Sequence, residues 1–193
     1  RRPYLLGRTQ LIENLEPVPG QSILEIGCGT AWNLVRAASA YPEARIYGFD
    51  VSPAMLETAN RNIQAAGFAG RIRTAQADAT TFDGMQVFGL QTYDRVFLSY
   101  SLSMIPDWTT VIWRAFDHVA PGGEIHIVDF GSFDGLPRVA GHAMRAWLHR
   151  FDVTPRITLE QEVRRQNLNR GWRVAFTQPY RGYCQTARIM RPK

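Results

Sequence analysis

Residues 24–31, LEIGCGTA, join an apolar run to a glycine-rich loop and decide the fold. The run from Ser22 to Ile26 is short and apolar and ends at a glycine, which is typical of a buried strand. Gly27 and Gly29 allow a sharp backbone turn and let a ligand approach without a Cβ in the way. Residues 31–40 are rich in Ala, Leu and Val. The stretch therefore predicts a strand, a tight turn and a helix.

A second strand and helix follow this first unit. Residues 45–50 indicate a strand, and Ser52-Pro53 is a typical helix start, with a capping hydroxyl and a proline in the first turn. Apolar residues then recur at helical spacing until Gly67. The remaining pattern predicts strands at 71–77, 93–99 and 124–130 and a helix at 108–119, ended by Ala120-Pro121-Gly122-Gly123.

This alternation predicts an α/β fold of the Rossmann-like, doubly wound kind. Strands that alternate with helices form a mostly parallel sheet covered on both faces. Residues 172–177 and 183–190 are expected to add an antiparallel pair at the sheet edge. With 193 residues, no linker and no internal repeat, residues 1–193 are expected to form one domain.

Composition limits the function classes. Apolar residues make up 45% of the chain and charged residues 20%, as in ordinary globular proteins. We expect no transmembrane helix and no secretory signal, because no apolar run is long enough for the first and the N-terminal run is too short for the second. Two cysteines make no disulfide framework, so the reducing cytoplasm is the expected compartment.

Charge is distributed unevenly along the chain. Residues 1–135 carry 10 Arg against 14 Asp and Glu, whereas residues 136–193 carry 12 Lys and Arg against three acidic residues. Such asymmetry suggests an acidic partner, either nucleic acid or an anionic membrane surface; a merely solvated basic face is the equally weighted alternative. No nucleic acid is expected overall, because the motifs described next favour a small-molecule or lipid-headgroup substrate.

A ligand site is expected where the strands end. Doubly wound sheets bind ligands at the carboxyl ends of their strands. Asp50 ends the second strand, and a carboxylate there can accept hydrogen bonds from both ribose hydroxyls. Asp78, after the third strand, can accept from the exocyclic amine of adenine, with the Ala79 backbone at the ring edge. The alternatives are a helix-capping Asp50 and an Asp78 that caps its own turn.

A nicotinamide cofactor fits this loop poorly. The dinucleotide fingerprint requires Gly or Ala three residues after the second glycine, and Trp32 stands there. A phosphate-free adenosyl ligand does not need that close approach to a pyrophosphate.

These motifs resemble those of class I S-adenosylmethionine-dependent methyltransferases over about residues 20–130. The resemblance rests on residues 24–30, 48–56, 78–79 and 120–123, and one departure is Ala31, where the family usually has a third glycine. It implies that S-adenosylmethionine is the cofactor. Its methionine part would lie at Glu25, Gly27 and Gly29, its ribose at Asp50 and its adenine at Asp78 and Ala79. Four further residues are expected beside the cofactor: Cys28, Val51, Met55 and Ser99.

A narrower resemblance covers nearly the whole chain. Residues 4–8, 99–106, 128–131, 136–138, 151–156 and 180–183 are similar to the bacterial betaine-lipid methyltransferases. That resemblance implies trimethylation of the homoserine amine of diacylglycerylhomoserine. The alternatives are a methyltransferase for a quinone or a soluble amine, and a non-catalytic module that binds the same cofactor.

Tyr100 is the expected catalytic residue. It follows the fourth strand and should face the transferred methyl group, where an aromatic face stabilises cations. Core packing remains the alternative for it and for the other candidate aromatics, Tyr4, Trp32, Trp108, Phe130 and Tyr183. His126 is expected to be structural, and Cys28 is expected to be small rather than nucleophilic. The His and Cys spacing predicts no metal site.

The pattern of residues 137–151 predicts an amphipathic basic helix. Its apolar stripe comprises Ala140, Ala143, Met144, Trp147, Leu148 and Phe151. Basic helices with a Trp can lie in a membrane interface, but from the sequence alone packing of the stripe on the core is favoured two to one. The betaine-lipid resemblance brings the two interpretations close to even, so peripheral contact with an anionic inner membrane is an expectation.

Overall fold

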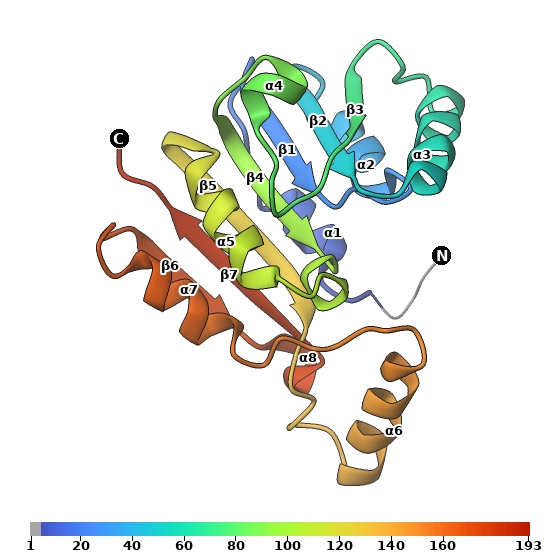
Figure 1. Ribbon diagram of the computed structural model, residues 1–193, viewed down its shortest axis with the longest axis vertical. Coiled ribbons are helices and arrows are strands. Elements are labelled where there is room, and N and C mark those ends of the chain that lie inside the picture. Colours follow the sequence, from blue (N-terminus) through green and yellow to red (C-terminus); the bar gives the residue numbers. More distant parts are fainter. Residues whose placement is uncertain (1–4) are drawn as a thin grey trace.

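The computed structural model describes residues 5–193 and contains one seven-stranded sheet (Figure 1). The strand order is β3-β2-β1-β4-β5-β7-β6. All neighbouring strands pair in parallel except β7, which runs antiparallel to both β5 and β6. The strands are β1 (Ser22–Ile26), β2 (Arg45–Asp50), β3 (Ile72–Gln76), β4 (Tyr93–Ser99), β5 (Val119–Phe130), β6 (Arg173–Thr177) and β7 (Cys184–Met190).

Helices cover both faces of the sheet. One buried cluster joins the first three helices to one face, and a second cluster joins α4, α5 and α7 to the other. The helices are α1 (Arg8–Glu13), α2 (Trp32–Ala40), α3 (Pro53–Ala65), α4 (Gly84–Phe88), α5 (Trp108–Asp117), α6 (Arg138–His149), α7 (Leu159–Asn167) and α8 (Pro179–Gly182), with a 3₁₀ turn at Leu102–Met104. The doubly wound fold predicted from the alternation is confirmed.

Alternation within single strands explains why both faces are apolar. In β1, Ile23 packs in the cluster on the α2 face, and Leu24 packs in the cluster on the α5 face. Successive side chains of a strand point to opposite faces, so a sheet covered on both sides needs a continuous apolar run. All five residues of β1 are buried, and Ile23, Leu24 and Ile26 supply the apolar surface, whereas Ser22 and Glu25 are buried polar residues.

The start of β5 differs from the prediction. Residues 120–123 were expected only to end a helix, but β5 already begins at Val119. The register with β4 shifts from Tyr93 opposite Val119 to Arg95 opposite Glu124. Gly122, with a φ of 72°, therefore lies in an irregular part of the strand that also turns the chain out of α5.

The basic amphipathic helix is present as α6, but its stripe is mostly not in the core. Only Gly141 and Leu148 of α6 are buried, whereas Trp147 is 39% exposed and Phe151, just beyond the helix, is 59% exposed. In Figure 1, α6 stands at one end of the molecule, away from the sheet. Packing of the whole stripe on the core, the interpretation favoured from the sequence, is therefore wrong for this chain.

None of the helices among residues 5–193 is long and apolar enough to cross a membrane.

Candidate functional site

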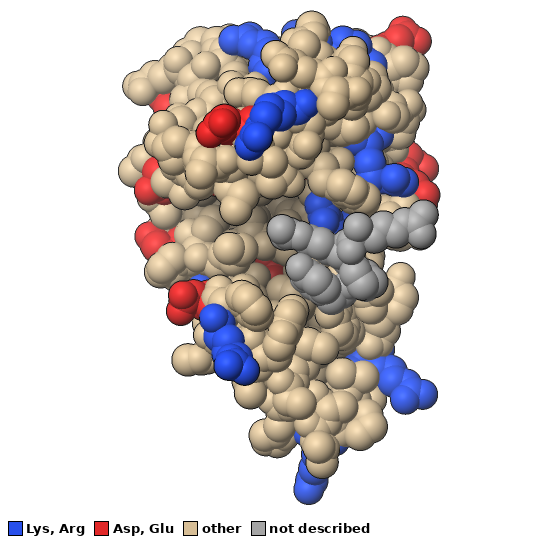
Figure 2. Space-filling model, turned by 90° about the vertical axis from the view of Figure 1, so that its right-hand side faces the viewer, with Lys and Arg blue, Asp and Glu red and all other residues tan. Residues whose placement is uncertain are grey.

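A cavity of about 1180 Å³ opens at the carboxyl ends of β1, β2 and β4. Its other walls come from the start of α1, the loop after β3, the segment after β4 and Tyr180. Figure 2 shows a hollowed region near the middle of one face of the molecule. All eleven residues predicted for the site line the cavity: Glu25, Gly27, Cys28, Gly29, Asp50, Val51, Met55, Asp78, Ala79, Ser99 and Tyr100.

The glycine-rich loop presents backbone to the cavity. The amides of Gly27 and Cys28 donate to the Phe49 carbonyl at 3.0 and 2.9 Å, which ties the loop to the end of β2. Gly27 has a φ of 74°, and a Cβ there would lie 2.8 Å from the Cβ of Ser101. Ala31, where the methyltransferase pattern has glycine, also has a left-handed φ, 62°. The departure from the pattern therefore leaves the backbone turn in place.

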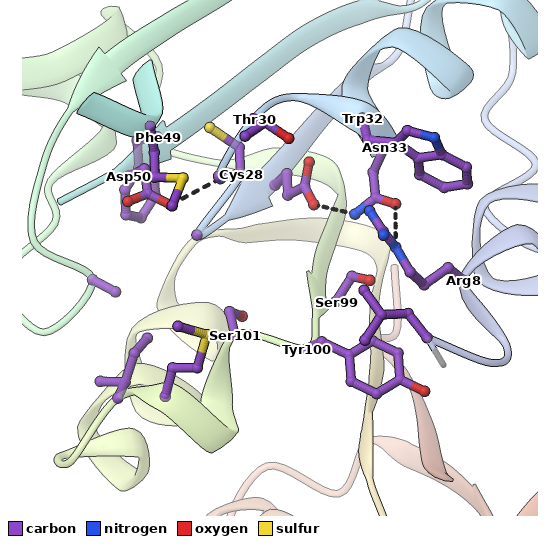
Figure 3. Close-up of a pocket in the computed structure, with 18 of the residues that line it drawn as sticks. Arg8, Cys28, Thr30, Trp32, Asn33, Phe49, Asp50, Ser99, Tyr100 and Ser101 are labelled. Carbon is purple, nitrogen blue, oxygen red and sulfur yellow. Dashed lines mark hydrogen bonds between the residues drawn. The ribbon is translucent and has the colours of Figure 1, made fainter. Parts of the chain in front are cut away.

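Asp50 holds the loop and faces the cavity. One carboxylate oxygen accepts from the Gly29 amide at 2.8 Å (Figure 3), and the other accepts from the Ser52 amide at 3.0 Å. The alternative of a helix-capping Asp50 does not hold, because Ser52 caps α3 and Asp50 joins the glycine-rich loop to the end of β2. Each oxygen has a second lone pair, so the carboxylate can still accept bonds from a diol.

Asp78 caps its own turn and also lines the cavity. Its Oδ1 accepts from the amide and the hydroxyl of Thr80 at 2.8 and 2.7 Å, and these bonds lower the pKa of Asp78. Val51 and Met55 line the cavity and are 62% and 43% exposed. These two exposed apolar side chains provide a surface of the kind that a flat aromatic ring covers.

Buried polar atoms in the cavity lack protein partners. Glu25 is 1% exposed, and its Oε1 accepts from the Asn33 side-chain amide. Within residues 5–193, Glu25 Oε2 and the hydroxyls of Ser99 and Ser101 have no hydrogen-bond partner. Burial raises the pKa of Glu25 from 4.5 to about 8. Buried polar groups are normally paired, so these three atoms fit a polar ligand in the cavity.

Tyr100 is tied into the protein by its hydroxyl group. The hydroxyl donates to the Leu6 carbonyl at 2.6 Å, and the ring meets Phe130 edge-on with centroids 4.7 Å apart. Burial raises the pKa of Tyr100 well above its ordinary value, which keeps the phenol neutral. Tyr100 has a φ of 57°, an uncommon conformation for a non-glycine residue, and such outliers gather at functional sites.

The other candidate aromatics are placed differently. Trp32 lines the cavity. Phe130 and Tyr183 do not line it; both are buried in the core, with their ring centroids 6.1 Å apart. Trp108 packs against the core on the α5 face, and Tyr4 lies outside the described residues.

His126 and Cys28 are both buried. His126 is 4% exposed and pairs with Glu124 at 2.9 Å inside the sheet. Burial raises the pKa of the Cys28 thiol well above its ordinary value, so it is a poor nucleophile. In the part of the chain that the structure describes, no group of three His, Cys, Asp or Glu residues could hold a metal ion.

Two residues that complete one end of the cavity, Arg8 and Asn33, are not indicated by any local sequence pattern. Arg8, at the start of α1, donates from Nε to Asn33 Oδ1 at 3.1 Å. Arg8 belongs to a quoted stretch of the betaine-lipid resemblance, but nothing there indicated a role. Asn33 lies in a helical pattern and has no local signal at all. Only the tertiary contact between α1 and α2 identifies them.

Comparisons with known proteins agree on one family. Residues 23–123 match the family described as Methyltransferase domain. The chain is 29% identical over 124 residues to a demethylmenaquinone methyltransferase of Geobacillus kaustophilus, covering 63% of this chain and 50% of the relative. It is 31% identical over 137 residues to the aklanonic acid methyltransferase DauC of Streptomyces sp., covering 68% and 60%. The chain spans about half the length of the first of these curated relatives.

The fold has close structural counterparts. The phosphoethanolamine N-methyltransferase 2 of Haemonchus contortus, solved with S-adenosyl-L-methionine, superposes with a TM-score of 0.77 at 15% identity. The superposition covers 96% of this chain and 52% of that one. At this identity, the likeness establishes the fold.

Proposed function

Since the chain belongs to the Methyltransferase domain family, we propose that it binds S-adenosylmethionine in the cavity and transfers its methyl group to an amine. The observation that carries this proposal is the junction of Gly29 with Asp50, because it brings an open glycine backbone and an acid at the end of β2 to one edge of the sheet. The cofactor supplies an electrophilic methyl group when it is bound.

The protein's own residues would divide the cofactor between them. Asp50 would hold the ribose hydroxyls, while Asp78 and Ala79 would meet the adenine that Val51 and Met55 cover. The glycine-rich loop with Glu25 would hold the amino-acid end. The cavity volume of about 1180 Å³ exceeds the needs of one nucleoside ligand, which leaves room for an acceptor.

The acceptor would enter beside Tyr100. The adjoining walls are largely apolar and comprise Leu5, Leu6, Met104, Ile105, Pro106 and Tyr180. Among the described residues that line the cavity, none is His or Lys. An amine carries its own lone pair once its ammonium form has lost a proton to solvent, and it then needs no strong general base. This lining therefore favours nitrogen as the acceptor atom. Tyr100 would then act through its ring, since its hydroxyl already donates to Leu6.

The finer proposal is that the amine belongs to a lipid headgroup, the homoserine of diacylglycerylhomoserine. The resemblance to betaine-lipid methyltransferases supports it, and so does the exposed apolar side of α6 with Val139 83%, Trp147 39% and Phe151 59% exposed. Arg138, Arg145 and Arg150 are exposed on or next to the same helix. Exposed apolar and basic side chains on one helix are typical of contact with an anionic membrane surface.

Labelled cofactor distinguishes the acceptors. The protein is incubated with S-adenosylmethionine carrying a labelled methyl group and with a total lipid extract, and the labelled species is identified. Label in an aminolipid headgroup supports the finer proposal. Label in a quinone or a soluble amine keeps the methyltransferase proposal and rejects the lipid. Cofactor binding without transfer to any of these acceptors leaves only a binding module.

Liposome sedimentation tests the membrane contact separately. Trp147→Ser combined with Phe151→Ser should reduce binding to anionic liposomes at low salt at least threefold. Trp113→Ser is a matched control, because Trp113 is 43% exposed on α5 and lies on another helix. Equal losses in both variants, or no wild-type binding at low salt, would remove α6 as a membrane contact.

A further inference from the structure

The N-terminal helix places a guanidinium group at one end of the cavity. Gly7 is the N-cap residue of α1 and has a φ of 81°, and Arg8 follows as the first helical residue. The Arg8 guanidinium lies 4.2 Å from the centroid of the Trp32 ring, and its Nε donates to Asn33 Oδ1 (Figure 3). The Leu6 carbonyl accepts from Tyr100, so the chain before α1 is fixed on the cavity wall. The contact of Leu6 before Gly7, and the contacts of Arg8 after it, therefore hold this part of the chain against the cavity wall.

One side-chain amide links this cation to a buried acid. Asn33 is 3% exposed; its Oδ1 accepts from Arg8 and its Nδ2 donates to Glu25 Oε1. The two partners fix which way the amide points, because a guanidinium only donates and the Asn33 nitrogen only donates. Glu25 Oε2 lies at the same end and has no partner in residues 5–193. The Arg8 guanidinium thus binds the oxygen of the Asn33 amide, and the Glu25 carboxyl group binds its nitrogen.

The start of α2 adds a second feature that favours an anion. Its N-cap residue is Ala31, and no side chain in the described part of the chain caps this nine-residue helix. The first amides of a helix point outward and favour negative charge. Trp32 and Asn33 are the first residues of α2, so these amides lie next to the Arg8 contacts.

We infer that Arg8 and the open start of α2 bind the carboxylate of the cofactor's amino-acid end, while Glu25 Oε2 accepts from its ammonium group and Asn33 spaces the two charges. This inference rests on the cofactor placement proposed above. Arg8 lies outside residues 23–123, which match the family, so the amino-acid end is recognised partly by a segment beyond the family match. Asn33 is a positioning residue here, and Arg8 is a cofactor-binding residue.

The test compares two ligands that differ only in the carboxylate. S-adenosylmethionine and decarboxylated S-adenosylmethionine are titrated calorimetrically into the wild type and Arg8→Gln. We expect Arg8→Gln to weaken S-adenosylmethionine about 10- to 100-fold, the scale of a lost charge-assisted bond, and decarboxylated S-adenosylmethionine less than threefold. Equal weakening of both ligands would overturn the inference, since Arg8 would then only support the fold.

Two further variants keep this comparison interpretable. Arg8→Lys retains the charge but not the planar fork, so it should weaken S-adenosylmethionine by less than Arg8→Gln does and leave the decarboxylated ligand unaffected. Arg36→Gln is the matched control, because Arg36 lies 5.0 Å from the same Trp32 ring and also lines the cavity. A carboxylate-specific loss in Arg36→Gln as large as that in Arg8→Gln would overturn the assignment to Arg8.

Methylthioadenosine separates this inference from the proposed function. It has the nucleoside and the sulfur but no amino-acid end, so Arg8→Gln should change its affinity less than twofold. If wild type binds neither methylthioadenosine nor S-adenosylmethionine, the proposed cofactor placement fails with the inference. If both bind and Arg8→Gln does not distinguish the carboxylate, only the inference fails.

Discussion

The free energy of unfolding should fall as the pH rises from 6 to 8. Replacing Glu25 with glutamine should remove most of that fall. Glu25 is buried, and its pKa in the folded protein is raised from 4.5 to about 8. The folded state therefore holds a proton that the unfolded state has already lost. This group stabilises the fold fully below pH 4.5, and the stabilisation disappears as the pH rises through about 8.

The size of the effect follows from the two pKa values. Over the full range, a shift from 4.5 to about 8 corresponds to about 5 kcal/mol of unfolding free energy. Between pH 6 and pH 8, linkage assigns about 2 kcal/mol of loss to this one group. Asp129, whose pKa burial raises to about 6, adds a smaller loss over the same interval. His126, whose pKa burial lowers, acts in the opposite direction.

Urea unfolding at pH 6, 7 and 8, followed by tryptophan fluorescence, measures this slope. A glutamine side chain has nearly the same shape as glutamate and can still accept from Asn33, so Glu25→Gln should flatten the slope by about 2 kcal/mol between pH 6 and 8. Glu57→Gln is the control, because that exposed carboxylate lies on α3 outside the cavity. A slope that is the same in the wild type and Glu25→Gln would refute the reasoning.

Three further substitutions test the fold and the site. Asp50→Ala should weaken S-adenosylhomocysteine by about 1–3 kcal/mol in calorimetry, and an unchanged affinity would remove Asp50 from the site. Gly131→Ala should lower the unfolding free energy by about 1–3 kcal/mol in urea titration, because a Cβ there would collide with the Gly182 carbonyl oxygen; full stability would contradict this close approach. Tyr100→Phe should cost about 1 kcal/mol of stability by leaving the Leu6 carbonyl unpaired but should retain methyl transfer, and abolished transfer in a folded variant would show that the hydroxyl is needed.

The sequence predicted the strands and one side of the cavity because those features are local. A strand buried on both faces reads as a nearly continuous apolar run, and in β1 Ile23, Leu24 and Ile26 supply it. A turn at the end of such a strand needs residues that tolerate a positive φ, which Gly27 and Gly29 provide. Parallel strands place their carboxyl ends at one edge, so Asp50 and Asp78 could be assigned to the same site. Their binding of the cofactor stays a prediction.

Other features depend on contacts that no local pattern encodes. Arg8 and Asn33 meet across 25 positions of sequence, and only the packing of α1 against α2 brings them together. The stripe on α6 indicated an amphipathic helix correctly, but its period is the same whether the apolar side meets the core or the outside. The early start of β5 at Val119 likewise depends on its pairing with β4.

By itself, the sequence determined the α/β fold, the glycine-rich turn and the acids at the strand ends, because strand periodicity and backbone freedom act over a few residues. Only the tertiary structure decided that a guanidinium from the N-terminal helix faces a buried, partly unpaired carboxyl group across one amide. Burial and charge pairing are properties of the assembled chain, since they depend on which distant segments exclude water from the same place.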